Sequence, residues 1–375
     1  MILESLVLTN FKNIADAALE FSPKINSLLG DNGMGKSNLL DALYYLSFCK
    51  SFSGQSDAQL IRRGESFAML RGRYRRRGQS EEVSASLREG MKKSFRLGGK
   101  EYSRLGEHIG RFPLVMLSPA DMAMVSGGAE ERRRFIDQII SQKDARYLDS
   151  LIRYNGLLAQ RNRMLKDGAS DATLLEVTEM QMDAAADYLT RRRAESVERL
   201  ETLFQHYYRA MAGSEGETVG LRYRSQLVGE DGAVEPLAGV LDRTRRRDEL
   251  LRFTGAGPHR DDIEMELDGM GVRRSASQGQ TKTFTCALRF AQYELLREAT
   301  GVSPLLLLDD IFDKLDAGRV ERMMALVGGS EVFGQIFITD TNRRHLDDII
   351  ADIPDAAHRL WDVSGGEFTL LEEGR

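Results

Sequence analysis

The chain has 375 residues, of which 42% are hydrophobic and 29% charged, and its net charge is −5 at pH 7. This composition is typical of a soluble globular protein of one large or two smaller domains, and its overall charge does not by itself indicate binding to nucleic acid. The two cysteines lie far apart and form neither a disulfide framework nor a zinc-binding spacing. We therefore expect a cytoplasmic protein without a signal peptide, a membrane span or a membrane partner.

The first hundred residues predict short strands around a single helix. Apolar or alternating runs at residues 3–8, 18–21 and 25–29 are typical of strands. Residues 38–48 carry apolar side chains at the spacing of a helix with a buried face. Alternation returns over residues 67–97 and is interrupted by RRRGQSEE, which predicts a hairpin turn in an antiparallel sheet.

The middle of the chain predicts helices. Between residues 129 and 211, apolar side chains recur at three-and-four spacing, and KDGASD at residues 166–171 interrupts the pattern. Two long helices folded back on one another, as a short antiparallel coiled coil, fit this pattern. An ordinary helical lid without a heptad seam fits it as well.

Strands return in the last third of the chain. Residues 304–308 and 335–339 are continuous apolar runs that suit buried parallel strands. We therefore expect an α/β domain built from the two ends of the chain, with a helical insertion between them. The predicted boundaries give residues 1–111 and 252–375 to the α/β domain and residues 112–251 to the insertion.

A glycine-rich loop connects the predicted strand at 25–29 to the helix that follows. The spacing Gly30-x-x-x-x-Gly35-Lys36-Ser37 is that of a P-loop, in which backbone N–H groups surround the phosphates of a nucleotide. Lys36 is expected to reach the β- and γ-phosphates of ATP, and Ser37 is expected to bind Mg²⁺. The predicted nucleotide-binding loop comprises Gly30, Asp31, Asn32, Gly33, Met34, Gly35, Lys36, Ser37 and Asn38.

Two carboxylates end the apolar run at residues 305–308. A P-loop requires an acidic group on a neighbouring strand to hold Mg²⁺, and Asp309 is the candidate. Asp310 is then placed to orient or deprotonate the attacking water, which favours ATP hydrolysis over storage of the nucleotide. The alternative is that both aspartates cap the next helix.

The residues after Asp310, IFDKLD, resemble the D-loop of ABC-type ATPases, which crosses to a second protomer. Such enzymes complete the site with a serine–glycine signature turn from that protomer. Three stretches qualify: VSGGAE at 125–130, ASQGQTK at 276–282 and VSGGEF at 363–368. We select Ser277, because it precedes an apolar helix close before Asp309, although a simple helix N-cap is the alternative.

Six blocks in register resemble the RecF family, ATPases of recombination and gap repair in the SMC-like branch of the ABC class. They are LTNFKNI, GDNGMGKSNLLDALYYL, RFPLVMLSPADMAMVSGGAEERRRFID, GPHRDD, SQGQTK and PLLLLDDIFDKLD. The resemblance implies an ABC-type ATPase head, and a homodimer that binds ATP and DNA, favours single-strand gap junctions, and loads RecA with RecO and RecR. It also assigns residue roles: Walker A to Lys36 and Ser37, Walker B to Asp309, the catalytic carboxylate to Asp310, the signature to Ser277 and Gly279, and the D-loop to Asp316.

Several positions depart from the ABC pattern or complete it less clearly. Asp310 stands where the class has glutamate, which predicts slow hydrolysis, and Asp340 stands where the class has a switch histidine. Lys12 is a weaker candidate for a nucleotide contact. A Q-loop is expected near residues 117–121, and His259 in GPHRDD is explained by a rigid turn or by a functional contact.

The sequence therefore predicts an ATPase switch, in which ATP joins two heads around DNA and slow hydrolysis releases them. A nucleotide-binding subunit of a membrane transporter is one alternative, and a DNA scaffold that uses ATP only structurally is another. Arginine clusters at residues 75–77 and 132–134 are the candidate contacts to DNA phosphates.

Overall fold

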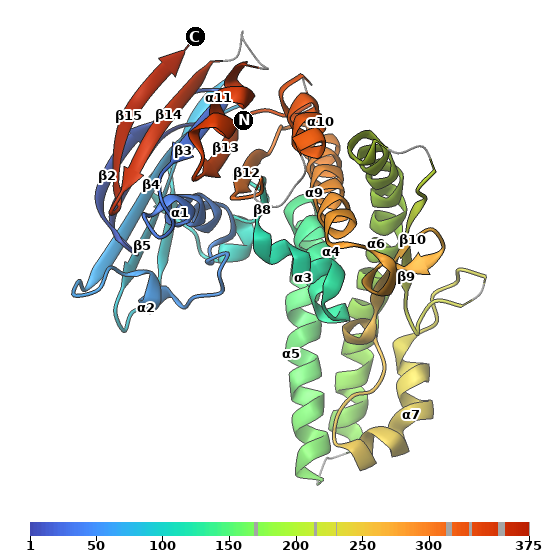
Figure 1. Cartoon of the computed structure of the whole chain (residues 1–375). Coiled ribbons are helices and arrows are strands. Elements are labelled where there is room, and N and C mark those ends of the chain that lie inside the picture. The colour runs from blue at the N-terminus through green and yellow to red at the C-terminus, as the bar shows by residue number, and fades with distance from the viewer. Residues whose placement is uncertain are drawn as a thin grey trace. The chain divides into compact units, whose positions relative to one another are not determined.

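The computed structural model describes residues 1–168, 172–213, 216–229, 231–312, 317–329, 332–351 and 357–374. The chain forms two compact units (Figure 1). The head unit comprises Met1–Asp121, Tyr207–Ser214 and Gln278–Arg375, and the helical unit comprises Met122–His206 and Glu215–Ser277. The sequence-based division at 111/112 and 251/252 stays a prediction.

A six-stranded sheet in the head unit contains both of the predicted buried strands. Its strands are parallel except for β15, which pairs antiparallel with β14. Both apolar runs are fully buried strands, as the sequence predicts. In order across the sheet, the strands are β15 (Glu367–Gly374), β14 (His358–Ser364), β3 (Ile25–Leu29), β13 (Ile336–Asp340), β12 (Leu305–Asp309) and β8 (Leu114–Leu117).

A second, antiparallel sheet completes the core of the head unit. Strand β4 alternates exposed and buried residues along its length, because one face of this sheet packs inward. Arg77 and Gly78 form the two-residue turn before β5, both at positive φ, as a tight hairpin requires. The order is β2 (Ile14–Glu20), β1 (Ile2–Phe11), β4 (Phe67–Arg76), β5 (Gln79–Arg88), β6 (Ser94–Leu97) and β7 (Lys100–Glu101).

Helix α1 (Lys36–Phe48) contacts strands of both sheets of the head unit. Nearly all of its side chains are buried, and they share one apolar core with both sheets. This helix follows the glycine loop directly, so the packing of the core fixes the position of the loop. The remaining helices of the head unit are α2 (Asp57–Leu60), α9 (Gln278–Thr300), α10 (Ala317–Gly329) and α11 (Arg343–Ala351).

The helical unit is dominated by α5 (Ala145–Asp167) and α6 (Ala172–Ala212). Helix α4 (Ala129–Lys143) precedes them, so the predicted first long helix is two helices that meet at Asp144. Asp144 interrupts the helix because its side chain accepts a hydrogen bond from the backbone N–H of Tyr147, which caps α5. The antiparallel coiled coil predicted for this region stays a prediction.

Shorter elements complete the helical unit. They are α3 (Met122–Ser126), α7 (Leu237–Leu251), α8 (Val272–Ser275) and a small sheet of β11 (Met270–Gly271), β10 (Asp262–Leu267) and β9 (Val219–Arg224). Within the described part of the chain, no helix is both long enough and apolar enough to cross a bilayer.

Candidate nucleotide site

The glycine loop lies between the end of β3 and the start of α1, so the predicted strand–loop–helix context is observed. Two glycines are required by close contacts. A Cβ on Gly30 would lie 2.3 Å from the backbone oxygen of Val363, and one on Gly35 would lie 3.0 Å from Nδ2 of Asn13. Gly35 also has a φ of 120°, which side chains disfavour. The loop is therefore held close to its neighbours on both sides.

Within the loop, Asp31, Asn32 and Gly33 are exposed and Met34 is partly buried. The backbone oxygen of Met34 accepts hydrogen bonds from Asn13 Nδ2 at 3.2 Å and from the Gly366 backbone N–H at 2.8 Å. The β14–β15 hairpin turn thus supports the loop.

Asn13 makes a second contact with this region. Its Oδ1 accepts a hydrogen bond from Asn38 Nδ2 at 2.8 Å. Sequence reasoning missed Asn13 and Gly366. The NFKN turn points to Lys12 as the nucleotide contact, but Lys12 forms an ion pair of 2.6 Å with Asp41, and its neighbour Asn13 contacts the loop.

Lys36 is only 6% exposed and has no side-chain acceptor within hydrogen-bonding distance among the described residues. Its ammonium group donates to the backbone oxygens of Gly30 at 2.5 Å and Asp31 at 3.0 Å. Burial lowers the pKa of Lys36, and nearby carboxylates act in the opposite direction, namely Asp310, Asp309, Asp340 and Asp31. An ammonium held by backbone oxygens inside a glycine loop can exchange them for phosphate oxygens at little cost.

Ser37 and Asp309 meet as the sequence predicts. Ser37 Oγ donates to Asp309 Oδ1 at 2.8 Å, and Thr339 Oγ1 donates to the same oxygen at 2.8 Å. Burial raises the pKa of Asp309, while these two hydrogen bonds and Lys36 lower it. A hydroxyl beside a carboxylate supplies the hard oxygen donors that suit Mg²⁺, which keeps several waters and binds few protein ligands.

The expectation that Asp309 lies on the strand next to the loop strand is wrong. Strand β13 lies between β3 and β12. Thr339, at the end of β13, therefore bridges the gap and holds both Asp309 and the backbone N–H of Asp310, which donates to Thr339 Oγ1 at 3.0 Å. Thr339 was missed because QIFIT was interpreted only as a buried strand.

Asp310 immediately follows β12 and has a φ of 49°. This left-handed conformation is uncommon outside glycine, but aspartate tolerates it better than most residues. It turns the chain sharply at the end of the strand, close enough to Lys36 for its carboxylate to favour the charged lysine. The two successive aspartates therefore have separate surroundings, as their predicted roles require.

Asp340, which replaces the switch histidine of the ABC pattern, ends β13 and is buried. Its Oδ2 lies 2.9 Å from Nδ1 of His345, and its Oδ1 accepts from the Asn342 backbone N–H at 2.8 Å. The His345 ring also contacts Phe312 edge-on, with centroids 6.1 Å apart. A histidine is thus present next to Asp340, and Asp340 itself occupies the position of the switch residue.

The predicted signature stretch leads into α9. Ser277 is exposed and directly precedes Gln278, the first residue of the helix. A Cβ on Gly279 would lie 2.3 Å from Nη1 of Arg319, so this glycine allows α10 to approach. The predicted D-loop residue, Asp316, lies outside the described residues.

The predicted Q-loop region contains no glutamine. It ends at Asp121, whose side chain accepts from the Ser118 backbone N–H at 2.8 Å and forms an ion pair with Arg289 of α9. The segment is therefore tied to the helix that the signature stretch begins.

His259 is occupied inside the helical unit. Its Nδ1 lies 2.8 Å from the Tyr154 hydroxyl and its Nε2 lies 3.0 Å from the Thr254 backbone oxygen. Burial lowers the pKa of His259 to about 4. These contacts favour the rigid-turn interpretation over a functional contact.

The arginines that we selected as DNA contacts are all engaged within the protein. Arg132 pairs with Asp262 at 2.6 Å, Arg133 donates to the Asp261 backbone oxygen at 2.6 Å, and Arg134 pairs with Glu130 and Glu131. At the other cluster, Arg75 pairs with Glu4, Arg76 with Glu81, and Arg77 donates to the Thr300 backbone oxygen. Each of them would have to give up a partner before binding a phosphate.

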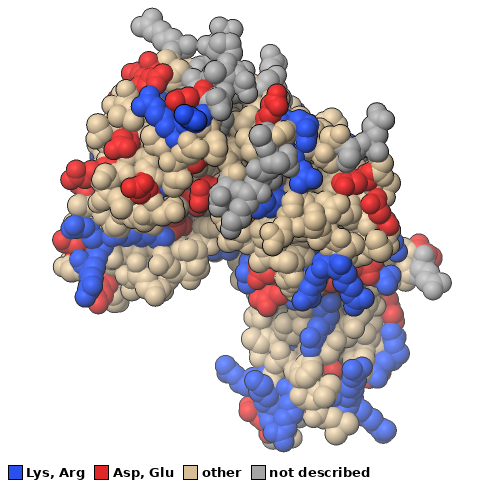
Figure 2. Space-filling model, viewed as in Figure 1, with Lys and Arg blue, Asp and Glu red and all other residues tan. Residues whose placement is uncertain are grey.

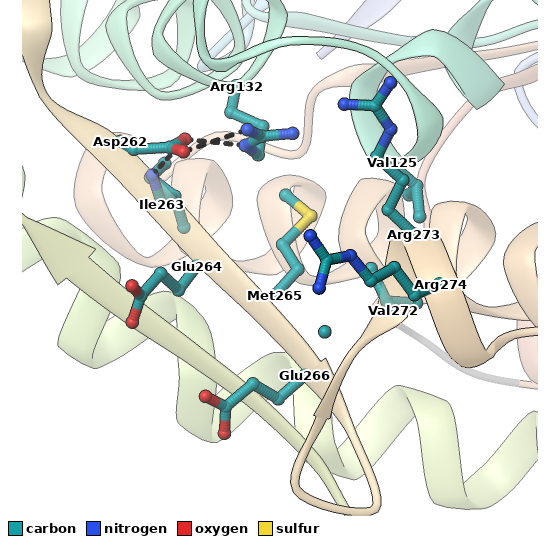
Figure 3. A pocket seen from close by; sticks show the side chains of 11 residues that line it. Val125, Arg132, Asp262, Ile263, Glu264, Met265, Glu266, Val272, Arg273 and Arg274 are labelled. Atoms are coloured by element: carbon teal, nitrogen blue, oxygen red, sulfur yellow. Dashed lines mark hydrogen bonds and ion pairs between the residues drawn. The ribbon is translucent and has the colours of Figure 1, made fainter.

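A hollow of about 780 Å³ in the helical unit borders the segment before the signature serine (Figure 3). Arg132 and Asp262 are joined on one side of it, and Arg274 of α8 extends toward Met265 of β10 (Figure 3). Glu264 and Glu266 also line it, but both pair with arginines of β9.

Three comparisons with known proteins agree with this site. A family model described as the RecF/RecN/SMC N-terminal domain matches residues 2–353. The chain is 47% identical over 373 residues to the DNA replication and repair protein RecF of Parabacteroides distasonis, with 100% of each chain covered. It is similar to a solved structure of the recombination mediator protein RecF with ATP in the RecFOR pathway, at a TM-score of 0.88 and 27% identity, over 99% of this chain and 98% of that one.

The Smc head domain of Pyrococcus furiosus, solved with an extended coiled coil and bound to the C-terminal domain of ScpA, has the same fold. Its TM-score is 0.59 at 16% identity, over 99% of this chain and 96% of that one. The predicted fold class, an α/β ABC-type P-loop ATPase head with a helical insertion, is therefore confirmed.

Proposed function

Because this chain belongs to the RecF family, we propose that it is an ATPase of recombinational DNA repair that binds DNA as an ATP-driven homodimer. The relative from Parabacteroides distasonis is named a DNA replication and repair protein, and the similar solved structure is a recombination mediator with ATP. The observation that carries the proposal is the convergence of Lys36, Ser37 and Asp309 on the glycine loop.

ATP occupies the loop with its phosphates against Lys36 and the backbone N–H groups at the start of α1. Ser37 and Asp309 would hold Mg²⁺, which would neutralise phosphate charge. Thr339 keeps Asp309 turned toward Ser37, through the hydroxyl contact of 2.8 Å. Burial lowers the pKa of Lys36, and the carboxylates of Asp310, Asp309 and Asp340 oppose this shift and favour the charged lysine.

Asp310 orients the water that attacks the γ-phosphate and accepts its proton. Its side chain is one methylene shorter than the glutamate of the wider ABC class, which makes hydrolysis slow. DNA stimulates hydrolysis by bringing two heads together. A slow step suits a clamp that stays closed for a set time and then opens.

The second protomer completes the site through Ser277, Gly279 and Asp316. An exposed serine immediately before a long helix is suited to receive a γ-phosphate presented by another molecule. The closed dimer clamps DNA at the junction of a single-strand gap and a duplex in the cytoplasm. With RecO and RecR it promotes the loading of RecA.

The experiment that tests this function compares Ser277→Arg with Ser126→Arg, a serine of the rejected VSGGAE stretch. A bulky cation at the signature turn should abolish dimerisation on ATP, measured by light scattering, and leave ATP binding by the monomer intact. Ser126→Arg should dimerise like the unchanged protein. An unchanged protein that stays monomeric with ATP and DNA both present contradicts the clamp.

A second variant in the same experiment separates a switch from a scaffold. Asp310→Asn should lower the rate of ATP hydrolysis by about 10²-fold or more, because it removes the group that accepts the proton. The dimer should then accumulate on DNA. If hydrolysis falls but residence on DNA is unchanged, ATP has only a structural role.

A further inference from the structure

Apolar side chains are exposed where helix α7 ends. Leu250 is 85% exposed, Leu251 is 46% exposed, and Phe253, in the turn that follows, is 37% exposed. Leu250 is the most exposed of the large hydrophobic residues in the described part of the chain. Exposed apolar groups of this size close together are uncommon unless they contact something.

Exposed cations are frequent in this part of the helical unit. They come from the last turns of α5, from α7 and from the turn after it, and among the described residues none forms an ion pair. Figure 2 shows lysine and arginine gathered at this end of the helical unit. The six cations are Arg163, Lys166, Arg246, Arg247, Arg252 and Arg260.

Among the described residues of the same segments, three carboxylates are exposed, namely Asp167, Asp242 and Glu249. We call this surface, the six cations with Leu250, Leu251 and Phe253, the arm tip. Its excess of positive charge stands out in a chain whose net charge is −5. A second copy of the chain would present the same charges and be repelled, so the surface fits an anionic partner of another kind.

The helical spacing of α7 mixes the two kinds of side chain. Arg246 lies one turn before Leu250, and Arg247 one turn before Leu251, so each pair covers neighbouring surface. The guanidinium group of Arg260 lies 5.1 Å from the centre of the Phe253 ring. A ligand that lies on this surface therefore meets positive charge and apolar groups together.

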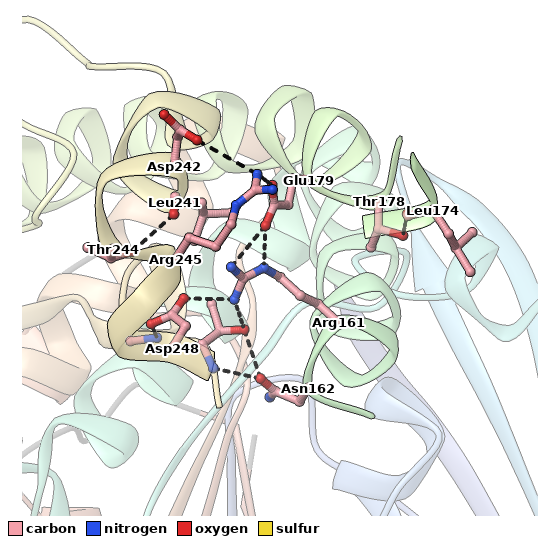
Figure 4. Close-up of polar contacts among 12 residues, drawn as sticks. Arg161, Asn162, Leu174, Thr178, Glu179, Leu241, Asp242, Thr244, Arg245 and Asp248 are labelled. Atoms are coloured by element: carbon pink, nitrogen blue, oxygen red, sulfur yellow. Dashed lines mark hydrogen bonds and ion pairs between the residues drawn. The ribbon is translucent and has the colours of Figure 1, made fainter. Parts of the chain in front are cut away.

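Beneath the arm tip the structure is fixed by a buried network (Figure 4). Arg161 of α5 is fully buried and donates to Glu179 of α6 at 2.9 Å, and to Asp248 of α7 and the Thr254 hydroxyl at 2.8 Å each. Arg245 of α7 pairs with Glu179 at 2.9 Å. Arg246 directly follows Arg245, and Arg247 directly precedes Asp248, and both of these neighbours belong to the network. The part of α7 that carries the two cations is therefore held in place.

A single-stranded nucleic acid, with its phosphodiester backbone and unstacked bases, offers groups that match this mixture of cations and apolar side chains. Arginine and lysine bind phosphates, and apolar or aromatic side chains contact bases that are not stacked in a duplex. A duplex shields its bases, so it would use the cations and leave the apolar groups without a partner.

We propose that the arm tip binds single-stranded DNA, with its cations on the phosphates and Leu250 and Phe253 on unstacked bases. This inference rests on the proposed function and adds to it the surface that contacts the single-stranded side of a gap. The arginine clusters at 75–77 and 132–134 are engaged within the protein, whereas the six cations of the arm tip form no ion pair with any described residue.

Two double variants of the full chain test the proposal by fluorescence anisotropy with a single-stranded oligonucleotide, a duplex and a gapped duplex. Leu250→Ser with Phe253→Ser should weaken binding to the single strand and the gapped duplex about tenfold, and leave duplex affinity and the salt dependence unchanged. Arg246→Ala with Arg247→Ala should weaken binding to the single strand and lower the slope of log affinity against log salt by about 1.4.

The matched control is Arg134→Ala with Arg191→Ala, because both arginines are exposed on the same unit but engaged in local ion pairs. It should bind all three DNAs like the unchanged protein. Thermal unfolding of every variant should match the unchanged protein, since the altered side chains are exposed.

Wild-type affinity of both arm-tip variants for the single strand overturns the proposal and assigns this surface to a protein partner. Equal weakening of duplex and single strand by the apolar variant overturns base contact. If only this inference fails, the protein without substitutions still dimerises on ATP and still has an ATPase activity that duplex DNA stimulates. If that protein shows neither property, the proposed function itself is contradicted.

Discussion

The head unit and the helical unit both bury charged side chains, but they surround them differently. In the helical unit, Arg161 is enclosed by two carboxylates, Glu179 and Asp248, and a hydroxyl. In the head unit, Lys36 donates to backbone oxygens, and burial raises the pKa of Asp309. Arg161 is paired directly with carboxylates, whereas Lys36 donates to backbone oxygens and, among the described residues, to no carboxylate.

This difference separates structural charges from functional ones. A closed network holds helices in one arrangement and has no group left for a ligand. A buried charge without a full set of partners costs stability, which the bound ligand restores. In the sequence, each site shows only that a charged residue is present. The two kinds of charge can be told apart only by the partners that each has in the folded protein.

The largest expected effect would break the closed network. Arg161→Met should lower the free energy of unfolding by about 3–5 kcal/mol, because Asp248 stays buried without its partner. Urea denaturation followed by circular dichroism measures the change. Arg191→Met, at an exposed pair with Asp187, should cost under about 1 kcal/mol and is the control. Equal costs at the two sites would contradict the comparison.

The same substitution in the head unit should behave in the opposite way. Lys36→Met should weaken ATP binding by about 100-fold, or ~3 kcal/mol, because the charge-assisted hydrogen bonds to phosphate are lost. Stability without nucleotide should be unchanged or higher, since burial disfavours the ammonium. Equilibrium binding of a fluorescent ATP analogue and urea denaturation measure both. Lys92→Met, at an exposed lysine, is the control. A large loss of stability would show that Lys36 is structural.

A smaller effect concerns pH in the helical unit. Burial lowers the pKa of His259 to about 4 in the folded protein, against about 6.5 when unfolded. The unfolded chain therefore takes up the proton first, so this contribution is complete above pH 6.5 and falls as the pH drops toward 4. From pH 7.5 to pH 5, the loss is about 2 kcal/mol.

The His259→Gln variant serves as the reference for that measurement. Its urea midpoint should depend less on pH than that of the unchanged protein, because it has no proton to take up at this position. Identical pH profiles would mean that His259 is solvated in the folded state.

Local patterns predicted the strand, loop and helix around the glycines and the carboxylate that Ser37 contacts. The spacing of Gly30, Gly35 and Lys36, the helix after them and the carboxylate of Asp309 all follow from short stretches of sequence. Each depends on backbone chemistry within a few residues, so the sequence carries it directly.

The supports of the loop were not predictable in the same way. Asn13, Thr339 and Gly366 reach the site through sheet order, and the position of β13 between β3 and β12 is set by packing of the whole core. The closed networks of the helical unit were also missed, because Arg161 finds Asp248 only after three helices have packed. Hydrophobic spacing predicts that a helix exists, but it does not state which charges its inner face must neutralise.

The support of Met34 by Asn13 and Gly366 has a consequence for how the protein is made. Strands β1 to β3 leave the ribosome first, the helical unit follows, and the β14–β15 turn emerges hundreds of residues after the loop that it supports. A nascent chain that ends before Gly366 has the glycine loop but not the hydrogen bond from Gly366 that supports it. The loop is therefore expected to reach its final shape only after most of the chain has been translated.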